Sequence, residues 1–202
     1  RPKVAVFGDL YSRDNRVMNQ NLTRFIESHG GEVVTTPYSE YARMIASPYL
    51  RKWFFEHKYF TLISSKILMT AISRLQRSHY RMFEKLLKEP MGTFDDPPEA
   101  LLSLYGVIIE HTGYSLYNLL KVHYIKKHHP DVTLFVQASP AFCCPSLVTE
   151  AMASRIEKVT GAPVVPITYD GTGGQKNDVI IPYLKYPRSA GPLSSRPMDR
   201  TG

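Results

Sequence analysis

The sequence predicts an α/β protein: a three-layer sandwich around a four-stranded parallel sheet of order 2-1-3-4, with a helical insertion after the second strand. Two observations predict this class. Short runs rich in Val, Ile, Leu and Phe, typical of buried parallel strands, begin at Lys3, Glu32, Asp131 and Ala162. Apolar residues at helical spacing separate most of these runs. Strands that alternate with helices predict parallel pairing through right-handed crossovers.

The first βαβ unit occupies the first 37 residues. A strand over 3–9 leads into a polar loop over 11–15, and apolar residues at helical spacing then predict a helix over 17–26. Gly30-Gly31 supplies a left-handed stop, and a second strand follows over 32–37.

The loop after the first strand begins with Gly8-Asp9, and Ser12 or Asp14 is expected to cap the following helix. Gly8 does not belong to a GxGxxG sequence, which argues against a nicotinamide or flavin site.

The insertion is expected at about 39–130, and its first half combines aromatic and basic residues. Between Arg51 and Glu89 there are nine Lys or Arg against three Glu. Such a segment can bind nucleic acid or an anionic cofactor. The alternative, which we favour, is a solvated basic face over an aromatic core. Further on, Glu110-His111 is compatible either with an acid-base pair or with a polar turn. A helix is then expected over 116–125, and Lys and His residues follow it before Pro130.

Both cysteines of the chain lie at the junction of the third strand, 131–138, with a helix expected to run to Gly161. Pro145 fits the first helical turn, so Cys143 and Cys144 lie near a helix N-terminus, where backbone N–H groups favour the thiolate. A thiolate can ligate iron or zinc or act as a nucleophile. Adjacent cysteines rarely form a disulfide with each other, so both are expected to be reduced. The alternative is a pair of small buried apolar residues.

The fourth strand, 162–168, leads into a glycine-rich loop that ends near Asp178. Backbone N–H groups of such a loop can bind phosphate or the sulfides of a cluster. The loop does not have the GxxxxGK[ST] order of an ATP-binding P-loop.

In the predicted strand order, the loops after strands one, three and four meet at the carboxyl edge of the sheet, where open α/β sheets bind ligands. From this placement we predict that Cys143 and Cys144 are metal ligands. The same placement predicts a set of cofactor-binding residues in these loops: Gly8, Asp9, Ser139, Gly171, Gly173, Gly174 and Gln175.

Composition limits the remaining possibilities. The chain has 202 residues and a net charge of +7, so anionic partners such as nucleotides, coenzyme A or an acidic protein are compatible with it. No apolar run is long enough to cross a bilayer, and a strand begins at once after Arg1-Pro2, so we expect no signal peptide and a cytoplasmic location. The main domain is expected to span 1–187, with an extended tail over 188–202.

Three stretches also resemble the last α/β domain of the 2-hydroxyacyl-CoA dehydratase family, particularly its large CoA-substrate-specific enzyme activases, also labelled acyl-CoA dehydratase activase-related proteins. The first contains Phe25-Ile26-Glu27 and Gly30-Gly31-Glu32-Val33-Val34. The second is the Phe142-Cys143 corner with Pro145 and Glu150, and the third is the fourth strand with Gly174-Gln175. Together these stretches cover most of the predicted sheet, whereas the aromatic insertion matches poorly.

The resemblance implies an iron-sulfur cluster held by cysteines from different domains, with Cys143 as one ligand and Cys144 beside it. Cys143 follows Phe142 at the strand end and is expected to face the edge of the sheet, whereas Cys144 precedes Pro145 and is expected to be the more buried of the two. In such proteins an ATP-dependent activase passes low-potential electrons to a 4Fe-4S cluster that serves radical dehydration of a 2-hydroxyacyl-CoA. Related proteins carry a double-cubane cluster instead.

This chain has no further cysteines and no activase ATPase motif. Other domains or subunits would therefore have to complete the site, and we expect no activity from the chain alone. A non-redox module that binds CoA or a nucleotide is the alternative, followed by a nucleic-acid-binding domain.

Overall fold

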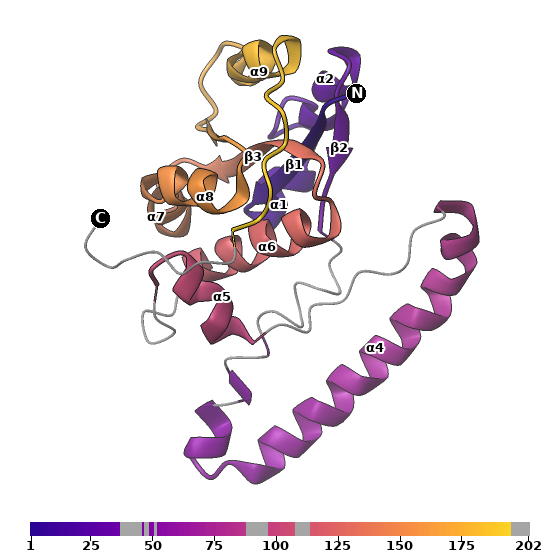
Figure 1. Ribbon diagram of the computed structural model, residues 1–202. Helices are drawn as coiled ribbons and strands as arrows, with labels where there is room; N and C mark the ends of the chain where they lie inside the picture. The colour runs from indigo at the N-terminus through magenta and orange to yellow at the C-terminus, as the bar shows by residue number, and fades with distance from the viewer. Residues whose placement is uncertain (37–45, 47–48, 51, 88–96, 108–113, 195–202) are drawn as a thin grey trace. The chain divides into compact units, whose positions relative to one another are not determined.

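The computed structural model describes residues 1–36, 46, 49–50, 52–87, 97–107 and 114–194 (Figure 1). The chain divides into two compact units, Arg1–Thr36 with Glu99–Gly202, and Pro37–Pro98. The separate inserted unit is thus shorter than the expected 39–130, because the helix expected over 116–125 belongs to the α/β unit.

The α/β unit contains the predicted sheet. Its strands are β1 (Lys3–Gly8), β2 (Glu32–Val34), β3 (Val132–Pro140) and β4 (Val164–Tyr169). They pair in the order β2-β1-β3-β4, and every pairing is parallel. The predicted fold class and strand order are therefore confirmed, and the order reverses between β1 and β3.

Alternation along the strands divides the core into two layers. One layer contains Val4 and Val6 of β1 with Leu134 and Val136 of β3, packed with residues of α2 (Leu22–Ser28) and α9 (Ile181–Lys185). The opposite face carries Phe7 and Phe135, whose rings meet edge to face at 6.1 Å. Two apolar faces require two helical layers, which makes this a three-layer sandwich.

Figure 1 shows α2 and α9 on one side of the sheet and α6 (Tyr114–His128), α7 (Cys144–Ala151) and α8 (Ala153–Thr160) on the other. Right-handed crossovers explain this division, because the chain moves from β1 to β2 in one direction and from β3 to β4 in the other. Residues 116–126 of α6 are all buried, including Lys121 and Lys126. The ammonium of Lys126 donates to the carbonyls of Pro130 and Val132, at 2.8 and 3.0 Å, beyond the end of the helix.

The β1–β2 crossover and the β3–β4 crossover each contain two helices where one helix was predicted. Between β1 and β2, α1 (Leu10–Asp14) forms where a loop was expected, and α2 begins only at Leu22. The capping prediction was wrong: Asp9 caps α1, and its carboxylate accepts from the Ser12 backbone N–H at 2.8 Å. Between β3 and β4, α7 and α8 meet at Met152.

α8 ends at Gly161, as predicted, and this glycine has the left-handed conformation. The chain beyond α9 returns to this point, since the N–H of Gly191 donates to the Gly161 carbonyl and the N–H of Ser194 donates to Val159. The rest of the tail, 195–202, lies outside the described residues.

The inserted unit contains α4 (Tyr59–Leu87), a helix of 29 residues. The expectation of an aromatic core here is wrong for Phe54, Phe55, Tyr59, Phe60 and Phe83, all of which are exposed. No described helix is both long and apolar enough to span a bilayer. A further short helix, α5 (Pro98–Leu104), precedes α6, and Glu110-His111 lies outside the described residues.

Candidate functional site

The carboxyl edge of the sheet brings together the loops that follow β1, β3 and β4. The N–H of Asp9 donates to the Ala138 carbonyl at 3.0 Å, and the N–H of Ala141 donates to the Tyr169 carbonyl at 3.2 Å. The loops after β1 and β3 are thus each hydrogen-bonded to the neighbouring strand as they leave the sheet. The expected convergence of these loops on one edge is confirmed by the parallel order of the strands.

Gly8 is required by backbone geometry. Its φ is +112°, and a Cβ at this position would lie 2.3 Å from the Ala138 carbonyl oxygen. β1 and β3 approach each other here more closely than a side chain permits. Gly8 therefore shapes the edge, and Asp9 beside it serves as the cap of α1.

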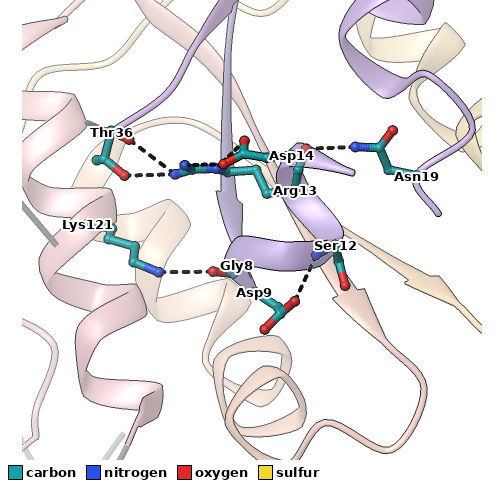
Figure 2. A network of polar contacts seen from close by, with 8 residues as sticks. All are labelled: Gly8, Asp9, Ser12, Arg13, Asp14, Asn19, Thr36 and Lys121. Carbon is teal, nitrogen blue, oxygen red and sulfur yellow. Dashed lines mark hydrogen bonds and ion pairs between the residues drawn. The ribbon is translucent and has the colours of Figure 1, made fainter. Parts of the chain in front are cut away.

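A network of polar contacts surrounds this turn (Figure 2). The Arg13 guanidinium forms two hydrogen bonds with the Asp14 carboxylate, at 2.9 and 2.8 Å. Its remaining nitrogen donates to the carbonyl and the hydroxyl of Thr36, at 3.2 and 3.1 Å. Arg13 is only 4% exposed, so a charge-compensated guanidinium joins α1 to the end of β2.

Lys121 reaches the same turn from α6. Its ammonium donates to the Gly8 carbonyl at 2.9 Å, and the residue is 3% exposed. Burial, with the nearby Arg13 charge, lowers the pKa of Lys121 to about 8, although Asp9 and Asp14 act in the opposite direction. A buried lysine thus lies beside the switch point of the sheet.

Sequence reasoning missed both Arg13 and Lys121. Arg13 was assigned to a polar loop. Lys121 follows the apolar pair Leu119-Leu120, and a lysine at such a position is expected to face solvent. The available signal for Arg13 was Asp9 followed by Ser12, which has the spacing of an N-cap and its N3 residue. No comparable local signal pointed to Lys121.

The cysteine corner lies where β3 gives way to α7. Phe142 has φ +61° and is 94% exposed, and Cys143 is the N-cap residue of α7. Both cysteines are free thiols, with Cys143 half-buried and Cys144 exposed. The expectation that Cys144 is the more buried of the two was wrong, because α7 begins at Cys144 and turns that side chain outward.

Beneath this corner, two buried polar groups are incompletely hydrogen-bonded. Gln137 of β3 donates to the Ser146 carbonyl at 3.0 Å. The amide oxygen of Gln137 and the hydroxyl of Ser146 have no hydrogen-bond partner within the described chain. Unsatisfied buried polar groups are rare in native structures, and here Ser146 follows Cys144 by two residues.

The glycine-rich loop after β4 has its own internal order. Asp170 accepts from the backbone and hydroxyl of Thr172 and pairs with Lys176, and these contacts lower the pKa of Asp170 to about 2. A Cβ added to Gly171, Gly173 or Gly174 would meet no atom within 4 Å. The three glycines therefore border open space.

Contacts of this loop lead to the β1–β2 crossover. The side-chain amide of Gln20 donates to the Gly174 carbonyl at 2.9 Å, and its oxygen accepts from the Lys176 N–H at 2.7 Å. Asn177, fully buried, accepts from the Tyr169 hydroxyl and donates to the carbonyls of Asn19 and Gln20. The loop was expected to meet the cysteine corner at this edge; the hydrogen bonds described between it and another loop are to Asn19 and Gln20.

The other two predicted cofactor-binding residues, Ser139 and Gln175, differ in accessibility. Ser139 is 2% exposed and pairs in register with Thr168, so it lies within the sheet. Gln175 is exposed at the start of η2 (Lys176–Ile180). Within the described part of the chain, no three His, Cys, Asp or Glu side chains are grouped so that they could hold a metal ion.

The comparisons with known proteins give no assignment: no family model, curated protein or solved structure matches the chain. What the structure itself defines is an α/β unit with two accessible thiols, a buried lysine and an open glycine loop along one edge of its sheet.

Proposed function

We propose that Cys143 and Cys144 contribute to the ligand set of an iron-sulfur cluster shared with another domain or subunit, in a system similar to the 2-hydroxyacyl-CoA dehydratases and their activase-related proteins. In such a system the cluster would receive low-potential electrons from an ATP-dependent activase. The observation that carries the proposal is the accessibility of both thiols at the carboxyl edge, at the start of α7.

An exposed apolar surface surrounds the thiols. Cys144, Leu147, Val148 and Ala151 recur at the spacing of one helical face, and all four are exposed. Phe142, 94% exposed and in the left-handed conformation, precedes them. An apolar surface around a potential ligand supports coverage by another protein surface, because such coverage would shield a cluster from solvent.

The donor set fits a shared cluster and does not fit a self-contained one. Thiolates are the usual protein ligands of iron-sulfur clusters, which take four in the common forms. This chain supplies two cysteines. When bound, the cluster would supply one-electron redox chemistry, while the start of α7 would hold the two sulfurs at the edge of the sheet.

Anaerobic reconstitution of the 202-residue chain tests the proposal. Ferrous iron and sulfide are added together with glutathione, which can supply the missing thiolates, and bound iron and visible charge-transfer absorption are measured. We expect uptake by the native chain and loss of uptake in Cys143→Ser/Cys144→Ser. The same double variant with Ser28→Cys, which places a thiol on exposed Ser28, serves as a control and should not regain the cluster. Equal iron uptake by the native chain and the double variant would reject the proposal.

A second candidate is a non-redox module in which the glycine loop binds the phosphate of CoA or a nucleotide. The open space around Gly171, Gly173 and Gly174 favours it, because backbone N–H groups can approach an anion only where no side chain intervenes. Titration with CoA and ADP, followed by amide chemical shifts, would give changes centred on 171–175 if this function is correct.

A further inference from the structure

A polar cleft lies beside the turn that carries Asn19 and Asn21. Its volume is about 360 Å³, and its walls include Arg13, Asp14, Arg16, Asn21, Arg24 and Glu27. These residues come from α1, from α2 and from the turn between them. The cleft therefore belongs entirely to the α/β unit and does not involve the cysteines.

Hydrogen bonds hold the two buried residues of the cleft, Arg13 and Asn19. Arg13 is held by Asp14 and Thr36, as described above, and its carbonyl accepts from the Asn19 side chain at 2.7 Å. The Asn19 oxygen in turn accepts from the N–H of Leu22 at 3.1 Å. Buried hydrogen bonds thus fix α1 and the start of α2 relative to each other, which reduces the entropy cost of binding a ligand between them.

The two other arginines of the cleft differ from several cations of the α/β unit that are paired with a carboxylate. Arg16 and Arg24 are exposed, and neither has a side-chain hydrogen bond or ion pair among the described residues. By contrast, Lys3 pairs with Asp131, Lys176 with Asp170, and Arg188 with Glu157. Two guanidinium groups without an internal carboxylate can therefore bind an external anion.

The turn that carries Asn21 into the cleft wall has an unusual backbone. Gln20 and Asn21 both have positive φ, at 53° and 56°, a conformation that is uncommon for residues other than glycine. Hydrogen bonds hold this turn in place: the Gln20 side chain bonds to the backbone of Gly174 and Lys176, and Asn177 donates to the Gln20 carbonyl. Strained backbone that its surroundings maintain is often found at binding sites, and here it adds a neutral amide to the two guanidinium groups.

We infer that this cleft binds the phosphate group of a small phosphorylated molecule. Arg16 and Arg24 supply the charge that a phosphate dianion requires, and guanidinium groups match its geometry. The carboxylates of Asp14 and Glu27 disfavour an extended polyanion such as a nucleic acid. The residues that line the site include neither the cysteines nor the glycine loop, so its test is separate from the tests of both proposed functions.

Titration of the 202-residue chain with inorganic phosphate at low ionic strength, followed by amide chemical shifts, tests the inference. We expect saturable changes confined to residues 13–27. Arg16→Gln/Arg24→Gln should raise the apparent Kd roughly tenfold, as expected for the loss of two exposed ion pairs. Asn21→Gly, which tolerates the positive φ, should raise Kd by a smaller factor.

Lys158→Gln/Lys185→Gln removes the same charge from two exposed lysines on α8 and α9 and is the matched control. Its Kd should stay close to that of the native chain. Three results would overturn the inference: no saturable binding, equal weakening in the control, or shifts centred outside the cleft. A single-stranded oligonucleotide that displaces phosphate at a lower concentration of phosphate groups would assign the cleft to nucleic acid and would also overturn it.

Discussion

The ammonium of Lys121 donates a 2.9 Å hydrogen bond to the carbonyl oxygen of Gly8, which lies 113 positions earlier in the sequence. This contact joins the middle of α6 to the last residue of β1 at the point where the strand order reverses. Because the lysine is buried, its protonation equilibrium is coupled to the stability of the fold.

The first prediction concerns this coupling. The pKa of Lys121 is lowered from 10.5 in the unfolded chain to about 8 in the folded one. Between these values the unfolded state binds more protons, so the contribution of Lys121 to the free energy of unfolding rises with pH from about 8 to 10.5. The shift corresponds to a gain of roughly 3 kcal/mol.

Urea denaturation of the native chain and of Lys121→Met at several pH values measures this effect. Other groups titrate in the same range, so the informative quantity is the difference in unfolding free energy between the two proteins. That difference should move in favour of the native chain as pH rises from 8 to 10.5. A difference that does not depend on pH would mean that Lys121 keeps an ordinary pKa.

The second prediction concerns the close approach of β1 and β3. Gly8→Ala forces a positive φ on alanine and places its methyl group against the Ala138 carbonyl. We expect a loss of about 3 kcal/mol or more in unfolding free energy, because strain and overpacking add. Gly173→Ala, where an added Cβ meets nothing, should change stability by less than about 0.5 kcal/mol in chemical denaturation. Similar losses in the two variants would contradict the described geometry.

The third prediction concerns the side chain that holds the glycine loop. Asn177→Ala removes the acceptor of the Tyr169 hydroxyl and the donor to the carbonyls of Asn19 and Gln20. We expect a loss of roughly 2–4 kcal/mol, since several buried groups lose their partner together. Gln175→Ala, at an exposed neighbouring position, is the control and should be nearly neutral. Hydrogen exchange should show the loop opening in the first variant only.

The fourth prediction concerns the two thiols. In the native chain Cys144 should react with an alkylating reagent faster than Cys143, because Cys144 is exposed and Cys143 is half-buried. Mass spectrometry of proteolytic fragments after brief labelling separates the two sites. Cys144→Ser should leave the unfolding free energy within about 0.5 kcal/mol of the native value. A strongly destabilised Cys144→Ser would indicate that this side chain is packed in the core.

Much of the fold could be predicted because it depends on local patterns. The apolar runs predicted the four strands, and the end of the apolar pattern at Gly161 predicted where α8 ends. The helix boundaries were less predictable: Asp9 begins a helix that the following polar residues concealed, since the residues that α1 buries are Ser12 and Arg13. Residues 116–126 are buried on every side, which no local pattern in a helix with two lysines indicates.

The candidate site could be predicted only as far as topology determines it. Parallel pairing fixed which loops share an edge, so Gly8, Cys143 and the glycine loop were placed correctly on it. The direction of each thiol depends on the backbone angles of Phe142 and Cys143, which composition does not determine. The Gln20 side chain holds the glycine loop through backbone groups that lie 154 and 156 positions later in the sequence, and no local pattern indicates such contacts.

The central pair of strands has a consequence for how the chain acquires its structure. β1 is completed within the first residues of the chain, yet its partner β3 lies far along it, and Thr133 bonds to the Lys3 carbonyl across 130 positions. Closing so long a loop carries an entropy cost that only later packing offsets. During synthesis the first βαβ unit would therefore leave the ribosome with one strand edge open, and the inserted unit would emerge before that edge could be paired. A nascent chain of this design depends on β3 for its rate of folding and for its protection from aggregation.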